Sequence, residues 1–135
     1  MRSMSGQALV ELALCAPVVV VLALGVTAVV QVEDANAGLD AATRAALSAA
    51  ARAPDQVSAE AAAQARFTAV VAAYPLRGTS LHLTFGSFSR GADVSATSDG
   101  YIDVGWAALV LPRHVELNAH GVIQLEPWRT HRTVA

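Results

Sequence analysis

The sequence LALCAPVVVVLALGVTAVVQV occupies residues 12–32, and it contains no charged residue. As an α-helix, these 21 residues would be about 32 Å long, at roughly 1.5 Å per residue. The hydrocarbon core of a bilayer is about 30 Å thick, so the segment has the length that a membrane-spanning helix needs. Valine is a mediocre helix former in water, but in lipid only a helix lets this segment satisfy its own backbone hydrogen bonds. We therefore expect a single transmembrane helix here.

The charges on either side of the apolar segment predict its orientation. Arg2 and the amino terminus precede it, whereas Glu33 and Asp34 follow it. Positively charged flanks stay on the cytoplasmic side of a membrane. The N-terminus is therefore expected in the cytoplasm, and everything after about residue 33 outside it.

The residues at the start of this segment carry a family resemblance. Residues 6–14 read Gly-Gln-Ala-Leu-Val-Glu-Leu-Ala-Leu, and Pro17 and the rest of the apolar run follow. The pattern resembles the TadE-like pseudopilins (minor pilins) of tight-adherence, or Flp-type, pilus systems. Those proteins open with a short basic leader, then Gly-Gln-Ala-Leu-Val-Glu-Phe-Ala-Leu and a proline before an apolar helix. The close match covers residues 6–25, and the later order of elements is similar more loosely.

The resemblance implies a part in pilus assembly and no enzymatic activity. A prepilin peptidase would cut after Gly6, so that residues 1–6 are a cytoplasmic leader and Gln7 becomes the mature N-terminus. Residues 7–34 would then be the transmembrane helix, and residues 35–135 an extracytoplasmic α+β domain. The implied partners are the peptidase, other pilins or pseudopilins, the inner-membrane assembly platform and the lipid bilayer, with no cofactor.

Gly6, Glu11 and Pro17 also have a physical interpretation. Glycine allows the extended, closely fitted backbone that a protease needs at the cleaved bond. A carboxylate at the edge of the hydrocarbon is costly if it stays unpaired, and the α-amino group of a neighbouring subunit is a suitable partner for Glu11. Pro17 removes one backbone donor, so we expect a slight bend that loosens the helix as it moves from lipid into a packed bundle.

Two other functions remain open at this point. Ala35-Asn36-Ala37 has the small residues of a signal-peptide cleavage site, so the chain could be a secreted binding domain released after Ala37. Its apolar stretch is longer than the usual core of a signal peptide, and Glu11 lies at its entry. The chain could also be a single-pass envelope protein that never polymerises. In both cases Gly6 would be an ordinary flexible residue and Glu11 a solvated charge.

Beyond the membrane, two helices are predicted. Residues 35–53 have a weakly apolar face at helical spacing and stop before Pro54, and the helix either hinges at Gly38 or continues from the membrane as one rod. Residues 55–73 form the second helix, which Asp55 or Ser58 caps. Its predicted buried stripe consists of Ala59, Ala63, Phe67, Val70, Val71 and Tyr74.

Three strands should follow the helices. Residues 81–85 and 115–125 alternate apolar and polar side chains, which is typical of half-buried strands. Between them, residues 102–110 are expected to be a strand, with a bulge or a close packing point at Gly105. Its predicted buried face consists of Ile102, Val104, Trp106, Ala108 and Val110. Residues 86–100 are rich in serine, glycine and aspartate and are expected to be a surface loop with a short edge strand near Val94. The fold class is therefore α+β and pilin-like: an N-terminal transmembrane helix that continues into an amphipathic helix, a second helix, and a small antiparallel sheet of about three strands.

The sequence offers little for catalysis or for binding a metal. The net charge of −2 argues against a nucleic-acid partner, and Cys15 is the only cysteine, so an internal disulfide and a cysteine-based zinc site are excluded. Neither a strained nucleophile turn nor a phosphate-binding loop is present. The remaining candidate ligands are taken as surface groups: His82, His114, His120, His131, Asp93, Asp99 and Asp103. A loose calcium site among the three aspartates, in residues 86–103, is the alternative.

Overall fold

The computed structural model describes residues 2–89, 91–109 and 111–125, and its architecture is α+β as expected. The helices are α1 (Arg2–Arg52) and α2 (Gln56–Val71). The strands are β1 (Arg77–Phe85), β2 (Asp93–Asp103) and β3 (His114–Gln124), and a short 3-10 helix, η1 (Gly105–Ala107), lies between β2 and β3. The strands form one antiparallel sheet in the order β1-β2-β3.

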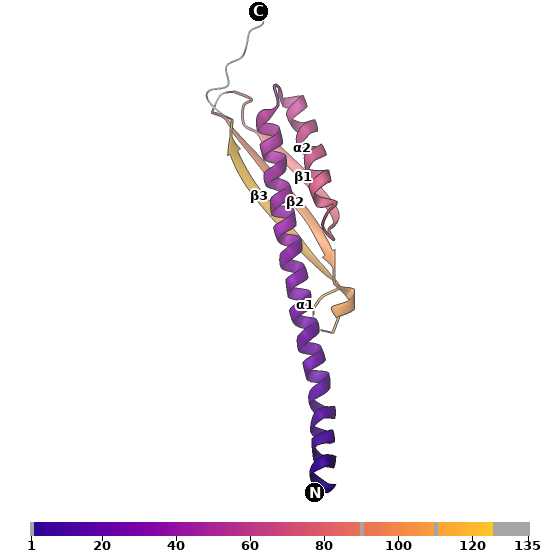
Figure 1. Ribbon diagram of the computed structural model, residues 1–135. Coiled ribbons are helices and arrows are strands. Elements are labelled where there is room, and N and C mark those ends of the chain that lie inside the picture. The colour runs from indigo at the N-terminus through magenta and orange to yellow at the C-terminus, as the bar shows by residue number, and fades with distance from the viewer. Residues whose placement is uncertain (1, 90, 110, 126–135) are drawn as a thin grey trace, which may run out of the picture.

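The transmembrane and amphipathic segments form one uninterrupted helix. α1 continues through Pro17 and through Gly38, so of the two possibilities at Gly38 the continuous rod is the one observed. Figure 1 shows α1 crossing the sheet in its C-terminal half and projecting beyond the domain in its N-terminal half. α1 ends at Arg52, directly before the predicted stop at Ala53-Pro54.

The core lies between one face of the sheet and the two helices. α1 packs on β2 and β3, while α2 lies beside α1 and contacts β1. The predicted stripe of α2 is buried at Ala59, Ala63, Phe67 and Val71. The buried face of α1 consists mainly of small side chains, which let the helix approach the sheet closely: Leu39, Ala42, Thr43, Ala46, Leu47 and Ala50.

Two contacts show how closely α1 is packed. The ring of Tyr74 lies against Gly38, where an added Cβ would stand 2.4 Å from the Tyr74 Cγ atom. On β3, a Cβ at Gly121 would stand 2.7 Å from a methyl carbon of Leu47. At both positions the lack of a side chain lets neighbouring elements approach closely. Neither glycine has a positive φ angle, so backbone conformation does not require glycine there.

A buried hydroxyl pair joins α1 to the middle of the sheet. The Oγ1 atom of Thr43 lies 2.6 Å from the Oγ atom of Ser98, and it donates to the carbonyl oxygen of Leu39 at 2.8 Å. Because that bond uses the only hydroxyl hydrogen of Thr43, Ser98 is the donor in the bond between the two side chains. Both hydroxyls are thereby satisfied at positions that are almost inaccessible to solvent.

The prediction of a surface loop over residues 86–100 was wrong for its second half. Residues 93–103 form β2, the central strand, which pairs with both neighbours. Between Val94 and Ile102, its inward positions are small or polar, so they do not give the apolar alternation by which a strand is recognised: Ala96, Ser98 and Gly100. Only the close approach of α1 makes these residues a core face.

The prediction of a strand over residues 102–110 was also wrong. β2 ends at Asp103, and η1 turns the chain toward β3. Ile102 and Val104 are buried as expected, but 46% of Trp106 is exposed and Ala108 lies on the surface. Gly105 begins the 3-10 turn and is not a bulge within a strand. Val110, the last residue of the predicted strand face, lies outside the described residues.

Candidate functional site

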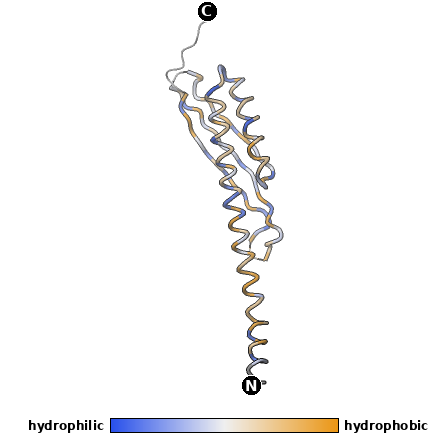
Figure 2. The backbone as a smooth tube through the Cα atoms, in the orientation of Figure 1, coloured by the Kyte–Doolittle hydropathy of each residue, from blue (hydrophilic) through white to orange (hydrophobic). Residues whose placement is uncertain are grey.

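The projecting half of α1 is the most unusual surface of the molecule. Every side chain described from residue 5 to residue 23 is exposed, including Leu12 at 65%, Leu14 at 70% and Val18 at 59%. Figure 2 shows that this stretch is predominantly hydrophobic as it leaves the domain. A core helix of a soluble protein would bury such a surface, whereas here it meets no other part of the described chain.

The length and composition of α1 fit a membrane. Among the described residues, α1 is the one helix long and apolar enough to cross a bilayer, and its most apolar part is almost entirely unburied. The backbone of the span is hydrogen-bonded within the helix, as lipid requires. The arrangement indicates a single-pass membrane protein with a small folded domain on one side.

The residues singled out from the sequence lie on this projecting segment. Gly6, Gln7, Glu11 and Pro17 all belong to α1, and all four are exposed. Apart from its chain neighbours and the nearby backbone of α1, no described atom lies within 4 Å of the place where a Cβ of Gly6 would be. Gln7 and Glu11 are four residues apart, so they lie one helical turn from each other on the same side of α1.

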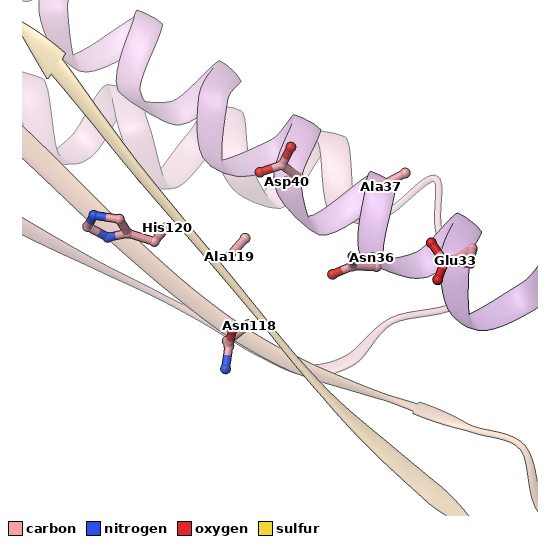
Figure 3. A pocket seen from close by; sticks show the side chains of 7 residues that line it. All are labelled: Glu33, Asn36, Ala37, Asp40, Asn118, Ala119 and His120. Carbon is pink, nitrogen blue, oxygen red and sulfur yellow. The ribbon is translucent and has the colours of Figure 1, made fainter. Parts of the chain in front are cut away.

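A shallow polar groove of about 370 Å³ runs between α1 and the edge of β3. Its walls include Glu33 and Asp40 from α1, and Asn118 and His120 from β3. Figure 3 shows these side chains spread along the groove without converging on one point. The Asp40 carboxylate is engaged by Arg44 at 2.9 Å. The groove therefore lacks the convergent polar groups that bind a small molecule or activate a nucleophile.

The candidate metal ligands are dispersed as well. His114 and His120 are exposed on β3, and His82 is exposed on β1. Asp93 and Asp103 lie at opposite ends of β2, about 33 Å apart at roughly 3.3 Å per residue. No group of three ligating side chains occurs among the residues that the structure describes. His131 lies outside the described part of the chain.

One exposed apolar segment was missed by sequence reasoning. Residues 104–112 contain no charged residue, and their apolar side chains suggested a buried strand. In the structure Leu109 is 87% exposed, and Trp106, within η1, is about half exposed. The signal that could have revealed this loop is the pair Gly105 and Pro112, which favours turns over a continuous strand.

Comparison with known proteins bears on the projecting helix directly. Residues 6–52 match a family model described as TadE-like protein. The match starts at Gly6 and stops where α1 stops, so it contains all four singled-out residues and about a third of the chain. No curated protein and no solved structure matches the chain.

The match agrees with the resemblance that the N-terminal motif indicates. The family is one of pilus components and is not known for enzymatic activity. Over the whole of α1 from Gly6 onward, this chain is similar to the TadE-like family, and that similarity suggests a protein associated with the Tad pilus.

Proposed function

We propose that this protein is a minor pilin, or pseudopilin, that takes part in assembly of a Tad/Flp-type pilus from the cytoplasmic membrane. The observation that carries the proposal is the exposed apolar half of α1, which projects from a domain that is packed without it. Such a helix can lie in lipid before assembly and against other pilin helices afterwards. The family match supports the proposal because it covers this helix.

Processing by a prepilin peptidase would remove residues 1–6. Gly6 is exposed and unobstructed, so a protease can reach the bond that it makes with Gln7. The bond lies within the first two turns of α1, and terminal turns open at little cost because their backbone groups lack a full set of helical partners. Cleavage would place a positively charged amine at Gln7, one turn from Glu11.

Glu11 would act when subunits associate. It lies at the inner end of the charge-free run, where the carboxylate loses much of its hydration once helices pack around it. The positively charged amine of a neighbouring subunit would compensate that loss. If either the amine or the carboxylate were missing, the other charge would be buried without a partner. We predict that the partners are other pilins or pseudopilins, the assembly platform and the peptidase. The N-terminus would lie in the cytoplasm.

The alternative of a secreted domain released after Ala37 conflicts with the packing of α1. Ala35 is fully buried and packs with Ile102 and Val104, and Val32 packs against the same cluster. Cleavage after Ala37 would remove these contacts and leave the apolar side chains of that cluster open to water. A single-pass protein that never polymerises keeps every contact, so only experiment separates it from a pseudopilin.

Mass spectrometry of the mature N-terminus tests the proposal. The protein is purified from membranes of cells that do or do not contain the cognate prepilin peptidase. We expect Gln7 with a free amine as the first residue only when the peptidase is present, and a Gly6→Val variant should keep its leader in both strains. An intact N-terminus in the presence of active peptidase, or a chain that begins at Gly38, would contradict the proposal.

A further inference from the structure

A second apolar surface lies on the loop between β2 and β3. Residues 104–112 read Val-Gly-Trp-Ala-Ala-Leu-Val-Leu-Pro, nine residues without a charge. Leu109 has the largest exposed fraction of the large hydrophobic side chains described, 87%, and Trp106 exposes 46%. A single exposed leucine needs no explanation, but an exposed tryptophan and leucine on one uncharged loop do.

The loop packs against α1 at the outer end of the charge-free run of that helix. Val104 is buried in a cluster with Ala35, and Val32 and Leu111 pack against that cluster. Further toward the N-terminus, Ala28 is fully buried on an otherwise exposed stretch of α1. Figure 1 shows the loop beside α1, at the end of the domain that faces the projecting helix.

The depth of the loop follows from the helix geometry. Ala28 precedes Glu33 by five residues, which is about 7 Å along a helix. If the apolar layer of the bilayer ends where the charge-free run of α1 ends, the layer includes Ala28, and its outer boundary lies at Val32, against whose cluster the loop packs. That is the depth at which tryptophan side chains collect in membrane proteins.

Charges and hydrogen bonds of the loop fit this position. Asp103 and Arg113 bracket the uncharged residues, and Asp103 pairs in register with His114 at the ends of β2 and β3. The Oδ1 atom of Asp103 accepts a hydrogen bond from the Gly105 amide at 2.9 Å. Inside the loop, the Ala107 amide donates to the Val104 carbonyl at 2.8 Å, and the Leu111 amide donates to the Ala107 carbonyl at 3.0 Å. These internal bonds lower the cost of placing irregular backbone near lipid.

We propose that residues 104–109 and 111–112 form a second membrane contact, which inserts Trp106 and Leu109 into the outer leaflet of the bilayer that α1 spans. The occupant of this apolar surface is lipid, because the surface is continuous with the membrane-spanning part of α1. Two contacts, one through α1 and one through the loop, hold the domain against the membrane in a fixed orientation. The inference depends on α1 being membrane-embedded and not on pilus assembly.

Tryptophan fluorescence of the full-length protein in lipid nanodiscs tests the inference. The sequence has two tryptophans, so Trp128→Phe leaves Trp106 as the only one. We expect nanodiscs of phosphatidylcholine and phosphatidylglycerol with brominated acyl chains to quench most of the Trp106 emission relative to unbrominated lipid. The matched control carries Val57→Trp with both native tryptophans replaced by Phe. Val57 is 79% exposed at the start of α2, so its emission should be unchanged by bromination.

A pair of aspartate substitutions separates lipid contact from other causes of quenching. Leu109→Asp should lower the quenching of Trp106, because a carboxylate resists transfer into lipid. Val122→Asp, at a 57% exposed position on β3, should leave it unchanged, and circular dichroism checks that each variant is folded. Quenching of Trp106 no greater than that of the Val57→Trp control would overturn the inference. So would emission that responds only to added copies of the protein, because the surface would then contact protein instead of lipid.

Discussion

At the scale of single residues, Gly38 shows how α1 is joined to the domain. The ring of Tyr74 occupies the space that a side chain at position 38 would need. Glycine costs about 1 kcal/mol relative to alanine inside a helix. The contact with Tyr74 explains why that cost is tolerated here: the chain that follows α2 closes directly onto α1.

Gly38→Ala is therefore expected to destabilise the domain, although alanine is the better helix former. The new Cβ would overlap atoms near the base of the Tyr74 ring, and overpacking of this kind typically costs about 1–3 kcal/mol. Denaturant unfolding of the protein in detergent micelles measures the change. In a Tyr74→Ala background the same substitution should be neutral or stabilising. Higher stability of Gly38→Ala in the native background would contradict the packing account.

Glu11→Gln tests the charge at the inner end of the span. The variant should insert into the membrane normally, because it removes a charge from the edge of the hydrocarbon. Assembly into pili should fall by about tenfold or more, because the amine of the neighbouring subunit loses its counter-charge. The assembled fraction is measured by quantitative blotting of sheared pili. Glu33→Gln, at an exposed acid near the other end of the run, is the matched control. Normal assembly of Glu11→Gln would refute this role for Glu11.

At the scale of elements, α2 begins at a well-formed cap. The Oδ1 atom of Asp55 accepts a hydrogen bond from the Ser58 amide at 2.9 Å, and its Oδ2 atom accepts one from the Ser58 hydroxyl at 2.8 Å. The amide hydrogen bond, followed by that of the hydroxyl, lowers the pKa of Asp55 below its ordinary value of 3.8. The ionised cap therefore stabilises the folded state more than the protonated one does.

This lowered pKa predicts a pH dependence of stability. Since the pKa is lower in the folded state, the contribution of Asp55 is fully present well above 3.8 and is lost as the pH falls through the folded value. Asp55→Asn keeps an acceptor but does not titrate, so its stability deficit should shrink on acidification. Glu60→Gln, at an exposed acid on α2, controls for general charge effects. Denaturant titrations from neutral to strongly acidic pH measure the difference. A deficit that stays constant with pH would contradict the assignment.

The elements differ in how well local sequence predicts them. The end of α1, the cap of α2 and the alternation of β3 were all predicted, because Pro54, Asp55 and the apolar pattern act over a few residues. β2 was missed because its buried face depends on a distant partner. Ser98 is buried only because Thr43, 55 residues earlier, satisfies its hydroxyl. No local pattern carries that information.

At the scale of the whole molecule, one helix serves two environments. The C-terminal half of α1 is a core element of an α+β domain, and its N-terminal half projects as an apolar rod. The motif at residues 6–17 was recognisable from sequence because its residues act together in a short stretch. Their cleavage and pairing remain predictions, since both depend on other proteins. The loop between β2 and β3 was not recognised, because Trp106 and Ala108 were assigned to the buried face of a strand, whereas both are exposed.

The membrane span can be tested with the only cysteine of the chain. Cys15 lies within the apolar run of α1 and is exposed in the protein itself, so in a subunit that is not assembled lipid is what shields it from a water-soluble maleimide. In membrane fragments open on both sides, we expect no labelling of Cys15 until detergent is added. A Cys15→Ser variant that carries Val57→Cys should label under both conditions. Labelling of Cys15 without detergent, at the rate seen with detergent, would contradict a helix embedded in the membrane.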